Sequence, residues 1–228
     1  MKSCCQALAG IVLLAVALLA PVLSLPAYAA QSYDNCTGFI DSLPATISSQ
    51  GTWCLRHDLS TAITSGIAIT VATNNVTIDC NDFKLGGLAA GTGMGSYGIV
   101  AYDQPNLTVR HCNIRGFLGG LVATGGGHRI EDNGFDGNTW VALDVEGAGS
   151  TIRGNRVIDT RGSTYIAGDA YGIYAGSGVD VLDNTVNGVA STPNGSGNAW
   201  AYGIVTESQG EGSVTGNRVR GVAASGAG

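Results

Sequence analysis

Two carboxylates separated by one residue, Asp144 and Glu146, are the side chains best placed to carry out chemistry. If this segment is a β-strand, positions i and i+2 face the same side and lie roughly 6.5–7 Å apart. Carboxyl groups at about that separation suit general acid and base roles across a glycosidic bond, with room for a water molecule. Acidic residues are also ordinary on a solvated sheet face, so the pair has two interpretations.

A sixfold repeat surrounds this pair and predicts the elements that position it. The template is an apolar residue, two variable residues, Asn, a variable residue and a second apolar residue. Its fourth position falls at Asn81, Cys112, Asn133, Asn155, Asn184 and Asn217. A second apolar series precedes the copies and consists of Ile69, Ile99, Leu121, Leu143, Ile173 and Ile204. The shortest period in both series is about 22 residues, which indicates a solenoid whose turns bury their apolar faces against neighbours.

The repeat is expected to form strands. Its apolar runs are short, alternate with a period of two and use Val, Ile, Thr and Phe. Gly accounts for 36 of 228 residues, which supplies tight corners. These features predict an all-β parallel β-helix of about six coils over residues 51–222, with 30–50 as a cap and 223–228 as a tail. Phe83 is expected to fill the second apolar position of the first copy of the repeat, which Ile114 fills in the second copy.

The chain resembles the right-handed parallel β-helix repeat proteins of the pectate-lyase-like superfamily. The resemblance covers residues 50–222 and draws on the repeat and on segments 51–60 and 66–80, which look like the opening coils of secreted members. It implies that the repeated Asn side chains stack in a ladder along the axis. Amides stacked about 4.8 Å apart satisfy one another's donors and acceptors. The alternative is that Asn is merely common in turns.

The resemblance also implies a substrate groove beside the corner loops 86–96, 159–170 and 188–201, each followed by Tyr-Gly-Ile. Alternation predicts an outward floor of two columns. The first contains Val100, Val122, Asp144, Tyr174 and Val205, and the second contains Tyr102, Thr124, Glu146, Gly176 and Glu207. We expect four residues to contact substrate beside the catalytic candidates: Tyr102, Tyr174, Trp200 and Glu207.

A third column is also expected to face outward. It consists of Gly98, Gly120, Ala142, Gly172 and Gly203. Two interpretations are open: bare backbone that lets a sugar ring approach closely, or glycines that mark a bend or bulge at the strand start.

The known catalytic motifs of the superfamily are not found. No Arg or Lys stands in the floor columns, where its lyases carry a base, and the motifs of its epimerases and galacturonan hydrolases are missing. A calcium ion is the one cofactor considered, with Asp144, Glu146 and Asp169 as ligands. Calcium takes six to eight oxygens, which these three do not supply, so no metal site is assigned.

Residues 1–29 are typical of a signal peptide. Lys2 precedes an apolar run over 11–19, and Ala27-Tyr28-Ala29 fits a cleavage site. The run is too short for a membrane anchor, so none is expected after cleavage. The chain that follows the signal peptide lacks Lys2, so it has 10 of the 11 Lys+Arg and all 17 Asp+Glu. Its net charge is therefore −7. This charge disfavours nucleic acid as a partner.

Four cysteines follow the signal peptide: Cys36, Cys54, Cys80 and Cys112. An even number in an exported chain predicts disulfides. Cys36 with Cys54 would join the cap to the first coil. Cys80 and Cys112 lie on adjacent coils and are either bridged or buried free thiols.

Together these observations predict a secreted or periplasmic β-helix protein that binds polysaccharide along its floor. Cleavage of that polysaccharide by hydrolysis or elimination is one hypothesis. A non-catalytic surface scaffold or adhesin-like solenoid is the alternative, and the missing enzyme motifs favour it. A third hypothesis, that the protein helps in the maturation of a metal cluster, is based on the resemblance alone. We also expect the open C-terminal end to be covered by further chain or by a subunit.

Overall fold

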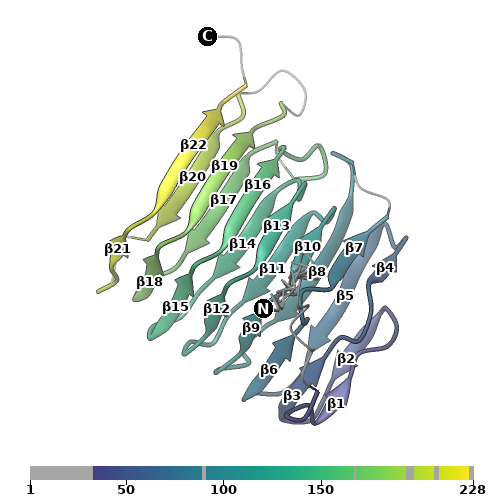
Figure 1. The fold of residues 1–228 in the computed structure, drawn as a ribbon. Helices are drawn as coiled ribbons and strands as arrows, with labels where there is room; N and C mark the ends of the chain where they lie inside the picture. The colour runs from purple at the N-terminus through teal and green to yellow at the C-terminus, as the bar shows by residue number, and fades with distance from the viewer. Residues whose placement is uncertain (1–32, 89–90, 167, 194–197, 208–210, 226–228) are drawn as a thin grey trace, which may run out of the picture. The chain divides into compact units, whose positions relative to one another are not determined.

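The computed structural model describes residues 33–88, 91–166, 168–193, 198–207 and 211–225, and its regular elements there are all β-strands. They form three parallel sheets (Figure 1). Sheet A contains β1 (Gly38–Phe39), β3 (Gly51–Cys54), β6 (Val76–Asp79), β9 (Thr108–Arg110), β12 (Arg129–Glu131), β15 (Ser150–Arg153), β18 (Val179–Leu182) and β21 (Val214–Thr215). Sheet B contains β2 (Ala45–Ile47), β5 (Ser65–Val71), β8 (Gly95–Ala101), β11 (Gly119–Ala123), β14 (Val141–Val145), β17 (Ala170–Ala175) and β20 (Ala201–Thr206). Sheet C contains β4 (Leu59–Thr61), β7 (Lys84–Gly87), β10 (Asn113–Arg115), β13 (Gly134–Asp136), β16 (Arg156–Thr160), β19 (Thr185–Ala190) and β22 (Arg218–Ala223).

The order of the strands confirms the predicted parallel β-helix. From β5 onward the chain visits sheets B, A and C in turn, so each strand pairs with the strand three places later. The predicted lead-in over 30–50 contributes β1 and β2, which are the first strands of sheets A and B. The predicted signal peptide, including its cleavage site after Ala29, lies outside the described residues.

The core contains columns of apolar side chains that run along the axis of the solenoid, among them one from sheet A and one from sheet B. Sheet A contributes Ile78, Val109, Ile130, Ile152 and Val181, all with 0% exposure. Sheet B contributes Ile69, Ile99, Leu121, Leu143 and Ile173, also with 0% exposure. Each such side chain contributes about 1.5–3 kcal/mol when it is buried. Because every coil needs its neighbours to bury these residues, the stack stabilises itself along the axis.

The turn between sheets A and C carries a continuous column of amides. Asn133, Asn155 and Asn184 each donate from Nδ2 to the Oδ1 of the next Asn, at 3.0 Å, and the column ends at Asn217. Each Nδ2 also donates to a backbone carbonyl of the preceding coil, as from Asn155 to Ile130 O at 2.8 Å. The buried amides therefore satisfy one another without water.

The first copy of the repeat departs from its predicted register. Leu85, rather than Phe83, pairs with Ile114, because the turn holds two extra residues. Asn81 and Asp82 take left-handed backbone conformations there, with φ of 48° and 63°. Asn81 accordingly lies outside the amide column and donates from Nδ2 to Leu55 O.

Both cysteine pairs form disulfides, so the alternative of free thiols at Cys80 and Cys112 is wrong. Cys36–Cys54 has a Cα–Cα distance of 5.8 Å and joins the segment that precedes β1 to the end of β3. Cys80–Cys112, with a Cα–Cα distance of 4.7 Å, joins adjacent coils. The backbone N–H of Cys112 donates to Asn133 Oδ1, so this disulfide continues the amide column at its N-terminal end.

The last coil leaves core positions open. Val214, Val219 and Val222 are 52%, 43% and 41% exposed. Their partners one coil earlier are fully buried: Val181, Val186 and Val189.

Within the described residues, no helix is long and apolar enough to cross a membrane.

Candidate functional site

The glycine column of sheet B faces the core, so the prediction that it faces outward was wrong. A Cβ on Gly120 would lie 2.5 Å from Ala142 O and 2.9 Å from the Phe135 ring. The strand register passes from Gly119↔Val141 to Leu121↔Leu143 without pairing Gly120 with Ala142. The bend interpretation therefore holds: an irregularity at the strand start breaks the alternation, and small residues fit where backbones approach closely.

This irregularity turns the preceding residues outward and creates a row of aromatic rings. Tyr97 lies edge-to-face with Trp140 at 6.4 Å, and Trp140 lies edge-to-face with Tyr171 at 6.3 Å. Tyr171 then stacks on Tyr202 at 5.1 Å, with the ring planes 8° apart. A Cβ on Gly119 would lie 2.7 Å from the Tyr97 ring, so only glycine leaves space for this ring on the neighbouring strand.

A hollow of about 270 Å³ opens beside this row on sheet B. Its lining consists of Trp140, Val141, Asp144, Glu146, Tyr171 and Tyr174. Asp144 on β14 pairs in register with Tyr174 on β17, as the outward column predicted. Tyr174 stands at right angles to Tyr171, with ring centroids 6.0 Å apart and planes at 85°. Two acids and three aromatic rings thus surround one hollow.

Asp144 has an unusual electrostatic environment. Its Oδ1 is buried and has no hydrogen-bond partner. Burial, together with the nearby Glu146 and Glu207 carboxylates, raises the pKa of Asp144 to about 7. A carboxyl group with this pKa holds a proton in mildly acidic solution and can donate it to a ligand.

Glu207 extends the acidic side of the site. The Tyr174 hydroxyl donates to Glu207 Oε1 at 2.8 Å, and this hydrogen bond is the main cause that raises the pKa of Tyr174 to about 12. Gly176 directly follows β17, in the coil between those of Glu146 and Glu207, and a Cβ there would lie 3.0 Å from Glu146 Cα. Because Gly176 has no side chain, nothing projects from the surface at this position between Glu146 and Glu207.

The fold suggested by this geometry agrees with a comparison against known families. The family described as right handed beta helix region matches residues 65–228. The chain belongs to this right-handed β-helix family. No curated protein and no solved structure matches the chain.

The predicted site residues of this β-helix protein fall into two groups. Asp144, Glu146 and Tyr174 line the same hollow, and Glu207 reaches it through its hydrogen bond with Tyr174. Tyr102 and Trp200 are each 56% exposed and are not part of the lining. Tyr102 follows β8, whereas Trp200 precedes β20, where its backbone N–H donates to Asp169 Oδ1.

Sequence reasoning missed the aromatic row. The signal was present in the repeated Tyr-Gly-Ile that begins at Tyr97, Tyr171 and Tyr202. Strict alternation from the following isoleucine would point each of these tyrosines inward, and the irregularity at the intervening glycine turns it outward. Trp140 has no such repeated neighbour and joins the row only through the stacking of coils.

Metal binding has no support at this site. Within the part of the chain that the structure describes, no three His, Cys, Asp or Glu side chains converge to hold a metal ion. Asp144, Glu146 and Asp169 therefore do not assemble the calcium site considered from the sequence. Asp169 instead accepts hydrogen bonds from Trp200 N and the Tyr171 hydroxyl.

Two larger hollows of about 470 and 370 Å³ lie over sheet C. Lys84 lines both and forms an ion pair with Asp58 at 3.4 Å, and Arg115 forms one with Asp136 at 3.4 Å. These charged groups already have partners, and exposed pairs of this kind are common on protein surfaces. The sheet B hollow is smaller but holds the unpaired acid and the aromatic row, so it is the better candidate site.

Proposed function

We propose that this β-helix protein binds a polysaccharide along the outward face of sheet B and hydrolyses it at Asp144 and Glu146. The observation that carries the proposal is the buried Asp144 carboxyl, with its raised pKa, beside a second carboxylate in a hollow lined by aromatic rings. Aromatic side chains supply flat apolar surfaces on which sugar rings stack.

The two carboxyl groups divide the chemistry of hydrolysis between them. Asp144, protonated, donates its proton to the glycosidic oxygen as the bond from that oxygen to the anomeric carbon breaks. Glu146 removes a proton from the water molecule that attacks the anomeric carbon. Their i and i+2 positions on β14 and just after it place them about 7 Å apart at the backbone, which leaves room for that water and supports inversion.

Elimination is less well supported than hydrolysis. A lyase needs a base that removes a proton next to a carboxylate, and superfamily lyases are expected to use Arg or Lys on this floor. The described strands of sheet B contain no Lys, Arg or His. The acid with the raised pKa instead matches the proton donor that glycoside hydrolysis requires.

Export of the protein is part of the same proposal. The two disulfides indicate an oxidising environment. The first 29 residues carry the pattern of a signal peptide, which supports secretion or transfer to the periplasm. A polysaccharide of the cell envelope or of the surrounding medium would be accessible there.

The test follows new reducing ends and ultraviolet absorbance of unsaturated uronates while the purified protein is mixed with a panel of polysaccharides. Hydrolysis predicts reducing ends without absorbance. Asp144→Asn and Glu146→Gln should abolish turnover. At about pH 4, where the native Asp144 is protonated, they should change thermal unfolding little. Asp136→Asn, on the outward face of sheet C, is the matched control and should retain turnover. Binding without turnover would contradict the hydrolase and assign the non-catalytic scaffold instead.

A further inference from the structure

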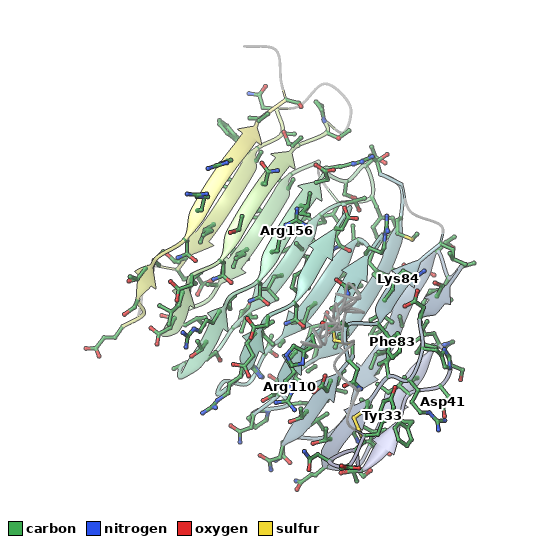
Figure 2. All side chains as sticks on the ribbon, viewed as in Figure 1. Tyr33, Asp41, Phe83, Lys84, Arg110 and Arg156 are labelled. Atoms are coloured by element: carbon green, nitrogen blue, oxygen red, sulfur yellow. A yellow bond between two sulfur atoms is a disulfide. The ribbon has the colours of Figure 1, made fainter. Side chains whose placement is uncertain are left out.

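The outward face of sheet B has no positive charge of its own. The described strands of sheet B contain no Lys, Arg or His, although the chain has basic residues to place. Five of these stand on strands of sheet C: Lys84, Arg115, Arg156, Arg218 and Arg220. Lys84 on β7 and Arg156 on β16 are labelled in Figure 2. The acids of the sheet B site therefore have no cationic residue on the strands of their own sheet.

The acids of the sheet B site also lack cationic partners. Six other aspartates form ion pairs with Arg, Lys or His: Asp41, Asp58, Asp79, Asp136, Asp159 and Asp183. Among the ion pairs of the described residues, none involves Asp144, Glu146 or Glu207. The mutual repulsion of these three groups contributes to the raised pKa of Asp144. A ligand with a positive charge would relieve that repulsion.

The aromatic rings around the hollow add a second attraction for a cation. Tyr171 lies at 85° to both Trp140 and Tyr174, so the three rings form perpendicular walls. Ring faces attract ammonium groups, and Trp and Tyr faces do so most strongly. The Tyr174 hydroxyl is engaged by Glu207, which holds this ring beside the acids.

We propose that the hollow of Trp140, Tyr171 and Tyr174 with its carboxylates binds a protonated amino group, and that the polysaccharide substrate is one that contains amino sugars with free amines. This rests on the proposed function, and it names the substrate class. A uronate polymer would instead bring its carboxylates beside Glu146 and Glu207. An uncharged polymer would leave the three acids uncompensated.

The test measures binding by calorimetry with the purified protein and three oligosaccharides of equal length. One is a glucosamine oligomer, the second is its fully N-acetylated form and the third is a galacturonate oligomer. We expect the glucosamine oligomer to bind at least about tenfold more tightly than the N-acetylated one, as a charge-assisted hydrogen bond allows. The galacturonate oligomer should bind most weakly.

Two variants connect the preference to the site. Glu146→Gln and Glu207→Gln keep the shape of each side chain and remove its charge. Each should reduce the affinity for the glucosamine oligomer about tenfold, and by a larger factor than it reduces that for the N-acetylated oligomer. Asp136→Asn on sheet C should change neither. Near-ultraviolet circular dichroism confirms that each variant is folded.

The outcomes separate this inference from the proposed function. If the N-acetylated or galacturonate oligomer binds as tightly as the glucosamine oligomer, the amine inference is wrong and polysaccharide binding stands. If no saccharide binds and a lysine-rich peptide does, both are wrong and the face is a peptide site. A preference for the amine that Glu146→Gln removes supports the inference, whether or not reducing ends appear.

Discussion

Replacing Asn155 by alanine tests how much the amide column stabilises the solenoid. Asn155 is 1% exposed and makes contacts with two neighbouring coils. Its Oδ1 accepts from the backbone N–H of Asn133 and from Asn133 Nδ2, each at 3.0 Å. Its Nδ2 donates to Ile130 O at 2.8 Å and to Asn184 Oδ1 at 3.0 Å.

The magnitude follows from the groups that the substitution leaves behind. The backbone N–H of Asn133 loses this acceptor, and Ile130 O loses this donor, at a place where the neighbouring side chains exclude water. Each buried polar group left without a partner costs about 1–3 kcal/mol. Ile130 O lies within a paired strand and keeps its backbone hydrogen bond to the neighbouring strand, so the Asn133 N–H is the group left without a partner. Asn155→Ala is therefore predicted to lower the free energy of unfolding by about 1–3 kcal/mol.

Urea unfolding followed by far-ultraviolet circular dichroism measures this change through the midpoint and the slope. Asn113→Ala is the matched control, because Asn113 is an exposed residue of the same type. Its Nδ2 donates to Asp82 O at the surface, where water replaces it, so a change within about 0.5 kcal/mol is expected. A loss at Asn155 no larger than that at Asn113 would refute the stabilising role of the column.

Three further predictions concern the disulfide, the glycine column and the site. Replacing both Cys80 and Cys112 by alanine should lower the free energy of unfolding by about 3–4 kcal/mol, because their sequence separation of 32 closes a long loop; the midpoint of urea unfolding measures it. Gly120→Ala should cost about 1–3 kcal/mol through the contact with the adjacent carbonyl, whereas Gly91→Ala, with no atom within 4 Å, should cost little; equal thermal midpoints would contradict this. Since the pKa of Asp144 rises to about 7 on folding from about 3.9 in the unfolded chain, the folded state holds the extra proton between these values. Stability should therefore fall as pH rises from about 4 to about 7, hydrolysis should fall above about pH 7, and urea titrations of Asp144→Asn should show a flatter pH dependence.

The hollow on sheet B shows where prediction of the site from sequence succeeded and where it failed. Asp144 and Tyr174 were placed together because each directly follows a residue of the same core column, Leu143 or Ile173. Glu146 was placed beside them because it follows Leu143 by three residues. Trp140 was not assigned to this group, because it precedes the core position Leu143 across the irregular strand start. The alternation of inward and outward side chains holds only within a regular strand, and one unpaired residue reverses the orientation of the residues that precede it.

The sequence by itself determined the solenoid, its shortest period of about 22 residues and the presence of disulfides. Those features follow from the periodic spacing of apolar residues, Asn and Cys, because each coil can bury its apolar face only against a copy of itself. Only the tertiary structure decided that Gly120 faces inward, that Leu85 replaces Phe83 in its column and that Asp144 keeps a proton near neutral pH. The register of Leu85 depends on the left-handed turn at Asn81 and Asp82. The other two depend on how closely coils approach, because that approach brings the backbone of one coil against the next and the Glu207 carboxylate near Asp144 across two coils.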